Sequence, residues 1–303
     1  MNPKHIILTL LIMLCPIGMA AQSNITRNKP KPGVAKPKHK PYSKPTAKPK
    51  AKTVPHNSTP HSGSPSSNIS LSVEINKLIN YMVYVEGGTF TMGGTNEQGY
   101  DALPFEKPIH NVTLSSYYIC KYEVTQALWQ VVMGNNPSNF KGDELPVESV
   151  SWDDCQKFIT RINSYTGRKF RLPTEAEWEF AARGGKYSRH YKYSGSNYID
   201  DVAWYNGNSG YTPHPVGSKL PNELGLYDMS GNVLEWCSDW YDTYNSYPQT
   251  DPQGPKVGSY RVIRGGCWWA SDKLSRLSFR IHSIPSHRDN DGDHGLRLVL
   301  SQL

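Results

Sequence analysis

The sequence predicts an α+β domain with few long strands, and three observations support this class. Three segments carry a helix pattern bounded by capping residues. The segments rich in β-branched and aromatic residues are short. Gly-Gly and Asn-Gly steps interrupt the chain every few dozen residues, which leaves much of the backbone in turns.

Three helices are expected, each with a recognisable start. The first, TQALWQVVMG, has Thr125 as N-cap and Gly134 at its end. The second, SWDDCQKFITRINSYTG, follows the N-cap Ser151, and its apolar residues recur on one face. The third, LPTEAEWEFAARGG, contains a capping box formed by Thr174 and Glu177, in which hydroxyl and carboxylate bind each other's free backbone amides.

Four segments are expected to contain strands, because β-forming residues alternate or cluster in them. They are YMVYVEGG, HNVTLSSYYICKYEVT, RVIRGG and GLRLVL. No second linker or internal repeat divides residues 75–303, so we expect one domain with one sizeable core.

Residues 1–21 are interpreted as a secretory signal peptide. Lys4 precedes an apolar run at residues 6–14, and small residues follow it. The run is too short to span a bilayer. Cys15 could accept a lipid, but Leu14 before it is larger than lipidation normally requires, so we favour an exported, unlipidated protein of the periplasm, envelope or medium.

Residues 22–74 are predicted to be a disordered tail rich in Lys, Pro and Ser. Residues 27–52 contain one Arg and nine Lys, and no acid occurs between Gln22 and Val73. Prolines and like charges oppose folding here, and few apolar side chains offset the entropy of ordering. The tail is either a solvated spacer or a contact to an anionic surface.

The net charge of +7 is concentrated in this tail. Outside Lys4 and the tail, residues 74–303 hold 22 basic and 26 acidic residues, so the folded part is mildly acidic. A nucleic-acid partner would require basic residues clustered on a folded surface, so we expect no nucleic-acid partner. No later apolar run has membrane-spanning length, so no transmembrane segment is expected.

Seven ordered motifs resemble the sulfatase-modifying-factor, or formylglycine-generating enzyme, family over residues 81–303. They are YVEGGTFTMGG, YYICKYEVTQALW, PVESVSWDDCQKF, RLPTEAEWEFAARGG, NELGLYDMSGNVLEWCSDWY, RVIRGGCWW and HGLRLVL. The resemblance implies that family's fold, a turn-rich variant of the C-type lectin architecture. It does not fix the activity, because one fold carries several functions.

The copper-binding cysteines of the formylglycine-generating enzymes have no counterparts here. In that family two thiolates hold Cu(I), four and nine residues after the second Gly of the RGG motif. The same count from Gly266 reaches Ala270 and Ser275, and no cysteine follows Cys267. The sequence therefore predicts a protein that binds no copper there and makes no formylglycine.

Cys267 stands where the family usually has Ser, and it permits a second hypothesis. With Cys237 it could form a disulfide, a pair of buried thiols or a displaced soft-metal site. An oxidoreductase acting on protein cysteine through Cys267 would need that thiol free, exposed and of lowered pKa. Cys120 and Cys155 are expected to be small buried apolar residues.

The resemblance also implies a calcium site in LYDMSGNVLEW. Carried over by position, its ligands are Asp228, the carbonyls of Gly231 and Val233, and Glu235. Such oxygen ligands on an irregular turn suit calcium. The alternative is that Asp228 and Asn232 satisfy turn backbone while Glu235 pairs with an arginine.

Other metal or catalytic sites find less support. The run DNDGD at 289–293 is interpreted as a hydrophilic turn, because its Gly and its twelfth position do not match an EF-hand. The domain's histidines show no close ligand spacing, although a scattered metal triad among them stays open; they are His110, His190, His214, His282, His287 and His294. No Gly-x-Ser-x-Gly elbow indicates a serine hydrolase.

The leading hypothesis is an exported, catalytically silent member of the family. It would bind a protein, peptide or glycan of the cell envelope through an aromatic groove formed by Cys267, Trp268 and Trp269. Core packing of these tryptophans is the alternative to an exposed groove. A purely structural envelope subunit held by the tail is a third interpretation.

Overall fold

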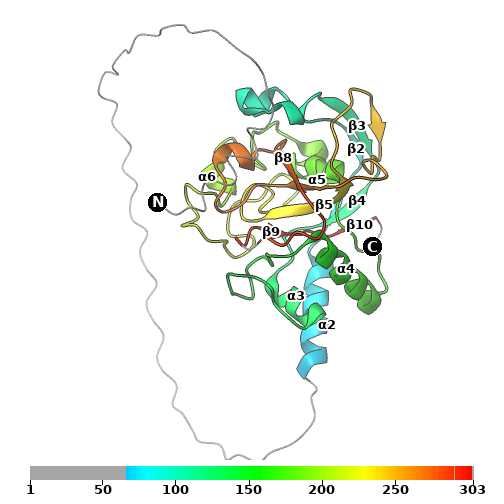
Figure 1. The fold of residues 1–303 in the computed structure, drawn as a ribbon, viewed down its shortest axis with the longest axis vertical. Coiled ribbons are helices and arrows are strands. Elements are labelled where there is room, and N and C mark those ends of the chain that lie inside the picture. The colour runs from blue at the N-terminus through cyan, green and yellow to red at the C-terminus, as the bar shows by residue number, and fades with distance from the viewer. Residues whose placement is uncertain (1–65, 290, 302–303) are drawn as a thin grey trace, which may run out of the picture. The chain divides into compact units, whose positions relative to one another are not determined.

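The computed structural model describes residues 66–289 and 291–301, and its ribbon is drawn in Figure 1. The predicted signal peptide, Cys15 and the Lys/Pro part of the tail lie outside these residues. The described chain begins with helix α2, Ser66–Asn80, which takes in residues that we expected in the tail. Leu78 of this helix is buried, and Leu71 and Ile75 pack against the same core, so a helical apolar stripe fixes the segment.

The strands form three small sheets rather than one large one. The first has the order β1-β4-β10, the second β2-β3-β6 and the third β8-β7-β5-β9. Their bounds are β1 Met82–Val85, β2 Gly88–Met92, β3 His110–Leu114, β4 Tyr117–Cys120, β5 Leu234–Trp240, β6 Gln249–Thr250, β7 Arg261–Arg264, β8 Arg280–Ser283, β9 His294–Gly295 and β10 Val299–Leu300. Most pairs are antiparallel, but β6 runs parallel to β3 and β9 runs parallel to β5.

All three predicted helices are present, with the predicted N-caps. They are α3 Gln126–Met133, α4 Trp152–Thr166 and α5 Glu175–Ala182. Thr125, Ser151 and Thr174 each accept a hydrogen bond from the backbone amide three residues later. Five shorter helical segments lie in the connections: η2 Asn96–Asp101, η3 Pro104–Glu106, η4 Gly185–Tyr187, α6 Ile199–Val202 and η5 Asp272–Ser275.

The predicted strand segments are present but more broken than expected. HNVTLSSYYICKYEVT divides at Ser115–Ser116 into β3 and β4, and GLRLVL supplies only β10 and the end of β9. The longest of these strands, β5, was not predicted, because its first residues, 234–236, are the end of the motif that we expected to be an irregular calcium loop. None of the described helices has the length and apolar character required to cross a membrane.

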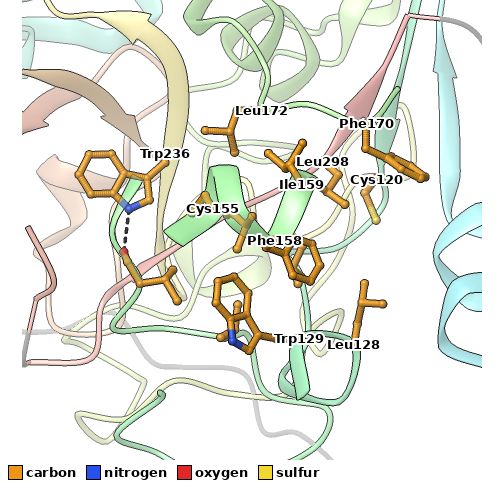
Figure 2. Packing of buried hydrophobic residues seen from close by; sticks show 14 of the residues in the cluster. Cys120, Leu128, Trp129, Cys155, Phe158, Ile159, Phe170, Leu172, Trp236 and Leu298 are labelled. Atoms are coloured by element: carbon orange, nitrogen blue, oxygen red, sulfur yellow. Dashed lines mark hydrogen bonds between the residues drawn. The ribbon is translucent and has the colours of Figure 1, made fainter. Parts of the chain in front are cut away.

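The core consists of two groups of buried apolar side chains. One lies between the helices and the third sheet, where α2, α3 and α4 gather at one side of the fold (Figure 1). In this group the rings of Trp129 and Phe158 stack with centroids 4.9 Å apart. Figure 2 shows Trp236 of β5 in the same group, its indole nitrogen donating to the carbonyl of Val150 at 2.9 Å. The core thus fixes β5, which pairs with β7 and β9, the strands next to the candidate site.

Candidate functional site

The segment after β7 is held close to the η5 turn by two glycines. Gly265 and Gly266 have φ angles of 102° and 76°, in the left-handed region that favours glycine. A β-carbon at Gly266 would lie 2.7 Å from Oγ of Ser275 and 2.8 Å from the carbonyl oxygen of Leu274. The Gly-Gly pair therefore brings the segment from Cys267 onward against η5.

The two positions that would carry copper-binding cysteines are buried in this segment. Ala270 is 3% exposed and Ser275 is fully buried. The Ser275 hydroxyl donates to the carbonyl of Ser271 at 3.4 Å. A methyl group and a hydroxyl supply no thiolate, so this segment has no pair of soft ligands at these positions.

Cys267 lies inside the core and does not meet the requirements of the oxidoreductase hypothesis. It is 1% exposed, and its thiol donates to Oδ2 of Asp293 at 3.8 Å. Burial and the Asp293 carboxylate raise the pKa of this thiol well above its usual value. A buried thiol with a raised pKa is a poor nucleophile.

The possible Cys237–Cys267 disulfide is not formed. Cys120, Cys155, Cys237 and Cys267 are all free and buried in the described part of the chain. Cys237 belongs to one core group and Cys267 to the other, so the two thiols occupy different apolar environments. Cys120 and Cys155 are 3% and 0% exposed, which confirms the prediction that they are small buried residues.

The prediction of an exposed aromatic groove is wrong for Trp268, which is buried. Its side chain is 8% exposed, its indole nitrogen donates to the carbonyl of Gly292 at 2.8 Å, and its ring packs on Phe140. Trp269 is half-buried and donates to Oδ2 of Asp293 at 2.6 Å. Both rings extend the core and hold the 292–293 turn, because buried indole N–H groups require an acceptor.

The DNDGD run is also more than a hydrophilic turn. Asp293 is 1% exposed, and its Oδ1 lies 2.6 Å from Nδ1 of His294. Asp289 Oδ2 lies 3.2 Å from the same nitrogen. The sequence did not predict this cluster, because it gave no reason to expect Asp293 inside the core.

The three titratable groups of this cluster shift one another's pKa. Burial raises the pKa of Asp293 to about 6. Burial disfavours the charged form of His294, but the two carboxylates outweigh it and raise the pKa of His294 to about 9. Burial would raise the pKa of Asp289, but the hydrogen bond and the positive charge of His294 hold it below its usual value. A single positive charge thus lies between two carboxylates.

The predicted calcium residues lie in a second buried cluster. Oδ2 of Asp228 accepts from the amide of Gly217 at 2.7 Å, and Oδ1 of Asp228 is a buried oxygen without a hydrogen-bond partner. Glu235 is fully buried and is paired with Arg297, whose Nη2 lies 2.7 Å from Oε1. Trp178 also donates to Glu235 at 2.8 Å. The pairing of Glu235 with an arginine follows the alternative interpretation of this motif.

Two members of this cluster were missed from the sequence. Glu123 is 2% exposed and accepts hydrogen bonds from the side chain of Asn232 and the amide of Val233. Arg297 also binds the carbonyls of Cys120 and Tyr227. Each is a charged residue isolated in an apolar run, YEVT or GLRLVL, and such residues are rarely buried without a partner.

The side chains of this cluster are of a chemical kind that suits an additional cation. Three buried carboxylates, those of Glu123, Asp228 and Glu235, face one guanidinium. Burial raises the pKa of Asp228 to about 6, and burial together with the other two carboxylates raises that of Glu123 well above its usual value. The set is made of hard oxygen atoms, and one of them, Oδ1 of Asp228, is buried without a hydrogen-bond partner.

Two clefts lie elsewhere, and neither is lined by Cys267, Trp268 or Trp269. The larger, of about 410 Å³, is lined by Glu175, Asp239 and Arg280 among others. These groups already hold the fold: Arg280 lies 2.7 Å from Glu175, and Asp239 accepts from the amide of Glu175 at the start of α5. The smaller, of about 130 Å³, reaches Glu123 beside α2.

Known proteins match this chain over most of its described residues. A family model described as a sulfatase-modifying factor enzyme 1-like domain matches residues 71–302. Chaperone protein LppX of Paenibacillus barcinonensis is 38% identical, covering 73% of this chain and 89% of that protein. The formylglycine-generating enzyme of Streptomyces coelicolor is 31% identical, covering 71% and 87%.

A solved structure shows the same architecture. Treponema denticola variable protein 1 superposes with a TM-score of 0.65 at 34% identity, covering 73% of this chain and 94% of that one. The α+β fold of the formylglycine-generating-enzyme type, a variant of the C-type lectin architecture, is thereby confirmed. The motifs, the family model and these relatives agree, and the chain belongs to the sulfatase-modifying factor family.

Proposed function

We propose that this protein is an exported family member that makes no formylglycine and acts as a binding or structural protein of the cell envelope. The observation that carries the proposal is the buried pair Ala270 and Ser275 at the positions of the copper-binding cysteines. The nearby thiol, Cys267, is buried with a raised pKa, which further argues against thiol chemistry. Cell fractionation that placed the chain in the cytoplasm would contradict the export part of the proposal.

A direct assay tests the absence of the family's oxidase activity. Incubation with Cu(I), oxygen and a cysteine-containing sulfatase peptide should leave the peptide unchanged in a mass spectrum, because no pair of thiolates holds the metal. The Streptomyces coelicolor enzyme, run in parallel, should convert its peptide. An aldehyde product made by this chain would overturn the proposal.

A protein is the partner class best supported. The 38% identical relative carries the name of a chaperone. Two pairs of tyrosines lie on and beside β1 and β4. Tyr81 and Tyr84 are 38% and 52% exposed, and their rings lie 5.0 Å from Tyr122 and 5.2 Å from Tyr118, respectively. Tyrosines give a large contact area at a low entropic cost, which suits recognition of polypeptide segments.

This binding role predicts that the protein suppresses aggregation of an unfolded polypeptide. The expected result is a lower light-scattering signal from a reduced, denatured test protein at an equimolar ratio. Tyr81→Ser with Tyr84→Ser should weaken the effect, whereas Tyr247→Ser, also exposed, should not. Equal scattering with and without the protein would contradict a chaperone-like role and leave the structural interpretation.

Calcium is proposed as a structural ion near Asp228, with Gly231, Val233 and Glu235 as the other candidate ligands. When bound, it would supply positive charge to carboxylates that Arg297 alone does not balance. Asp228 would bind through its free oxygen, and Glu235 would share its carboxylate with Arg297.

Removal of calcium should therefore lower the melting temperature. At a free calcium concentration of 100 times Kd, binding stabilises a protein by about 2.7 kcal/mol. Asp228→Asn should abolish most of this response, and Asn tolerates the left-handed backbone at this residue, whose φ is 59°. The exposed Asp143→Asn is the matched control. Identical melting curves in chelator and in calcium would contradict this site.

A further inference from the structure

A second group of ligand-type side chains lies apart from the predicted calcium motif. One ligand atom from each of Asp289, Asp293 and His294 lies within 4.8 Å of the other two. Asp293 and His294 stand where the chain enters β9, whose His294 pairs with Leu234 of β5 in parallel register. The amide of Leu234 also donates to the carbonyl of Asp293 at 2.7 Å. Two of the three residues are thus fixed by a sheet and the core, which favours a preorganised site.

The ligand-type atoms of the group converge on one point, where they contact one another. Nδ1 of His294 lies 2.6 Å from Oδ1 of Asp293 and 3.2 Å from Oδ2 of Asp289. The other oxygen of Asp293 accepts from the indole of Trp269 at 2.6 Å. Such an outer hydrogen bond orients the carboxylate, so that its other oxygen, which contacts Nδ1 of His294, is directed at the centre of the group.

The charge of the group is not balanced by neighbouring arginines or lysines. Within residues 66–289 and 291–301, Asp289 and Asp293 form ion pairs with His294 alone. Arg288, the adjacent cation, is engaged with Asp154 at 2.6 Å. Two carboxylates around one imidazole nitrogen, with Asp293 1% exposed, carry one negative charge more than a protonated His294 neutralises, and a divalent partner that displaced the Nδ1 proton would balance them.

The geometry points to a divalent transition-metal ion as that partner. We propose that Asp289, Asp293 and His294 bind an ion of the Zn²⁺ class. One imidazole nitrogen and two carboxylate oxygens suit such borderline ions, with bonds of about 2.0–2.2 Å. Ligand atoms that share such an ion lie about 3 Å or more apart, so the Asp293–His294 pair need open by only a few tenths of an ångström.

Of the three proposed ligands, Asp289 is the most exposed. The side chain of Asp289 is 19% exposed, whereas those of Asp293 and His294 are 1% and 8% exposed. The exposed His287 has its ring 6.1 Å from that of His294, which makes it the candidate for a fourth ligand. Cys267 is excluded from the set, because its thiol is held as a donor to Asp293. The site differs in this respect from a copper centre made of sulfur.

The test is a Zn²⁺ titration of the full chain after treatment with a chelator, carried out in excess calcium. We expect about one Zn²⁺ per chain, and Asp289→Asn should weaken its binding by at least about tenfold. Asp291→Asn removes the same charge from the same turn and is the matched control. His294→Gln should abolish binding; because its buried position could impair folding, the partly exposed Asp289 carries the comparison.

Co²⁺ provides a second measurement that a merely structural cluster would not give. The bound ion should show visible absorption of a nitrogen- and oxygen-ligated site without an intense sulfur charge-transfer band, and Asp289→Asn should remove it. Absence of stoichiometric Zn²⁺ binding would overturn the proposal. So would Zn²⁺ binding that neither Asp289→Asn nor a folded His294→Gln variant weakens. Neither result bears on the proposed lack of formylglycine chemistry, which the peptide assay measures separately.

Discussion

Replacing Arg297 with methionine should lower the free energy of unfolding by about 3–5 kcal/mol in the absence of calcium. The guanidinium is fully buried and binds Glu235 and two backbone carbonyls. Its loss leaves the buried carboxylate of Glu235 with the indole of Trp178 as its remaining donor, next to Glu123 and Asp228. A buried charge without its partner is among the costliest defects in a core.

Urea unfolding measures this effect as a lower midpoint at an unchanged slope. The exposed Lys169→Met removes one positive charge without touching the core and should change stability by less than about 0.5 kcal/mol. Combining Arg297→Met with Glu235→Gln should cost less than the sum of the two single changes, because the remaining group is then neutral. A loss below about 1 kcal/mol for Arg297→Met would show that the carboxylates are not buried as described.

Trp236→Ala should destabilise the domain by about 3–5 kcal/mol. The side chain is fully buried and belongs to the core group drawn in Figure 2, so truncation leaves a large cavity. It also leaves the carbonyl of Val150 without its indole donor. Trp236→Phe retains most of the apolar volume and should cost less, because its main defects are the lost hydrogen bond and a smaller void.

The same urea titration compares these variants. Tyr247→Ala is the control, because its side chain is 74% exposed and its loss should change stability by less than about 0.5 kcal/mol. If Trp236→Phe cost as much as Trp236→Ala, the hydrogen bond rather than the packing would dominate. If both variants were as stable as the unmutated protein, the core assignment of β5 would be wrong.

Local features were the ones that the sequence allowed us to predict. Thr125, Ser151 and Thr174 cap their helices through contacts with amides three residues away. Residues close together in the sequence are therefore enough to predict these helix starts. The family motifs then indicated the fold. Helix α2 was not predicted at all, because its first residues are a serine-rich stretch and its stabilising contacts come from the core.

Sites that depend on long-range contacts could not be derived. Asp293 reaches Cys267 across 26 residues, and Glu123 reaches Asn232 across 109. Parallel pairing of β9 with β5 brings His294 into the core beside Trp236, and no spacing of histidines along the chain reveals that. The burial of Trp268 has the same origin, because its acceptor, Gly292, lies in that distant turn.

The most direct test of the central claim is a Cu(I) titration of the reduced protein, followed by X-ray absorption at the copper edge. We expect no stoichiometric copper, and about one Cu(I) per chain in the Ala270→Cys, Ser275→Cys double variant, which restores the two sulfur ligands. Stoichiometric Cu(I) with sulfur ligands in the unaltered chain, lost in Cys267→Ser, would contradict the account.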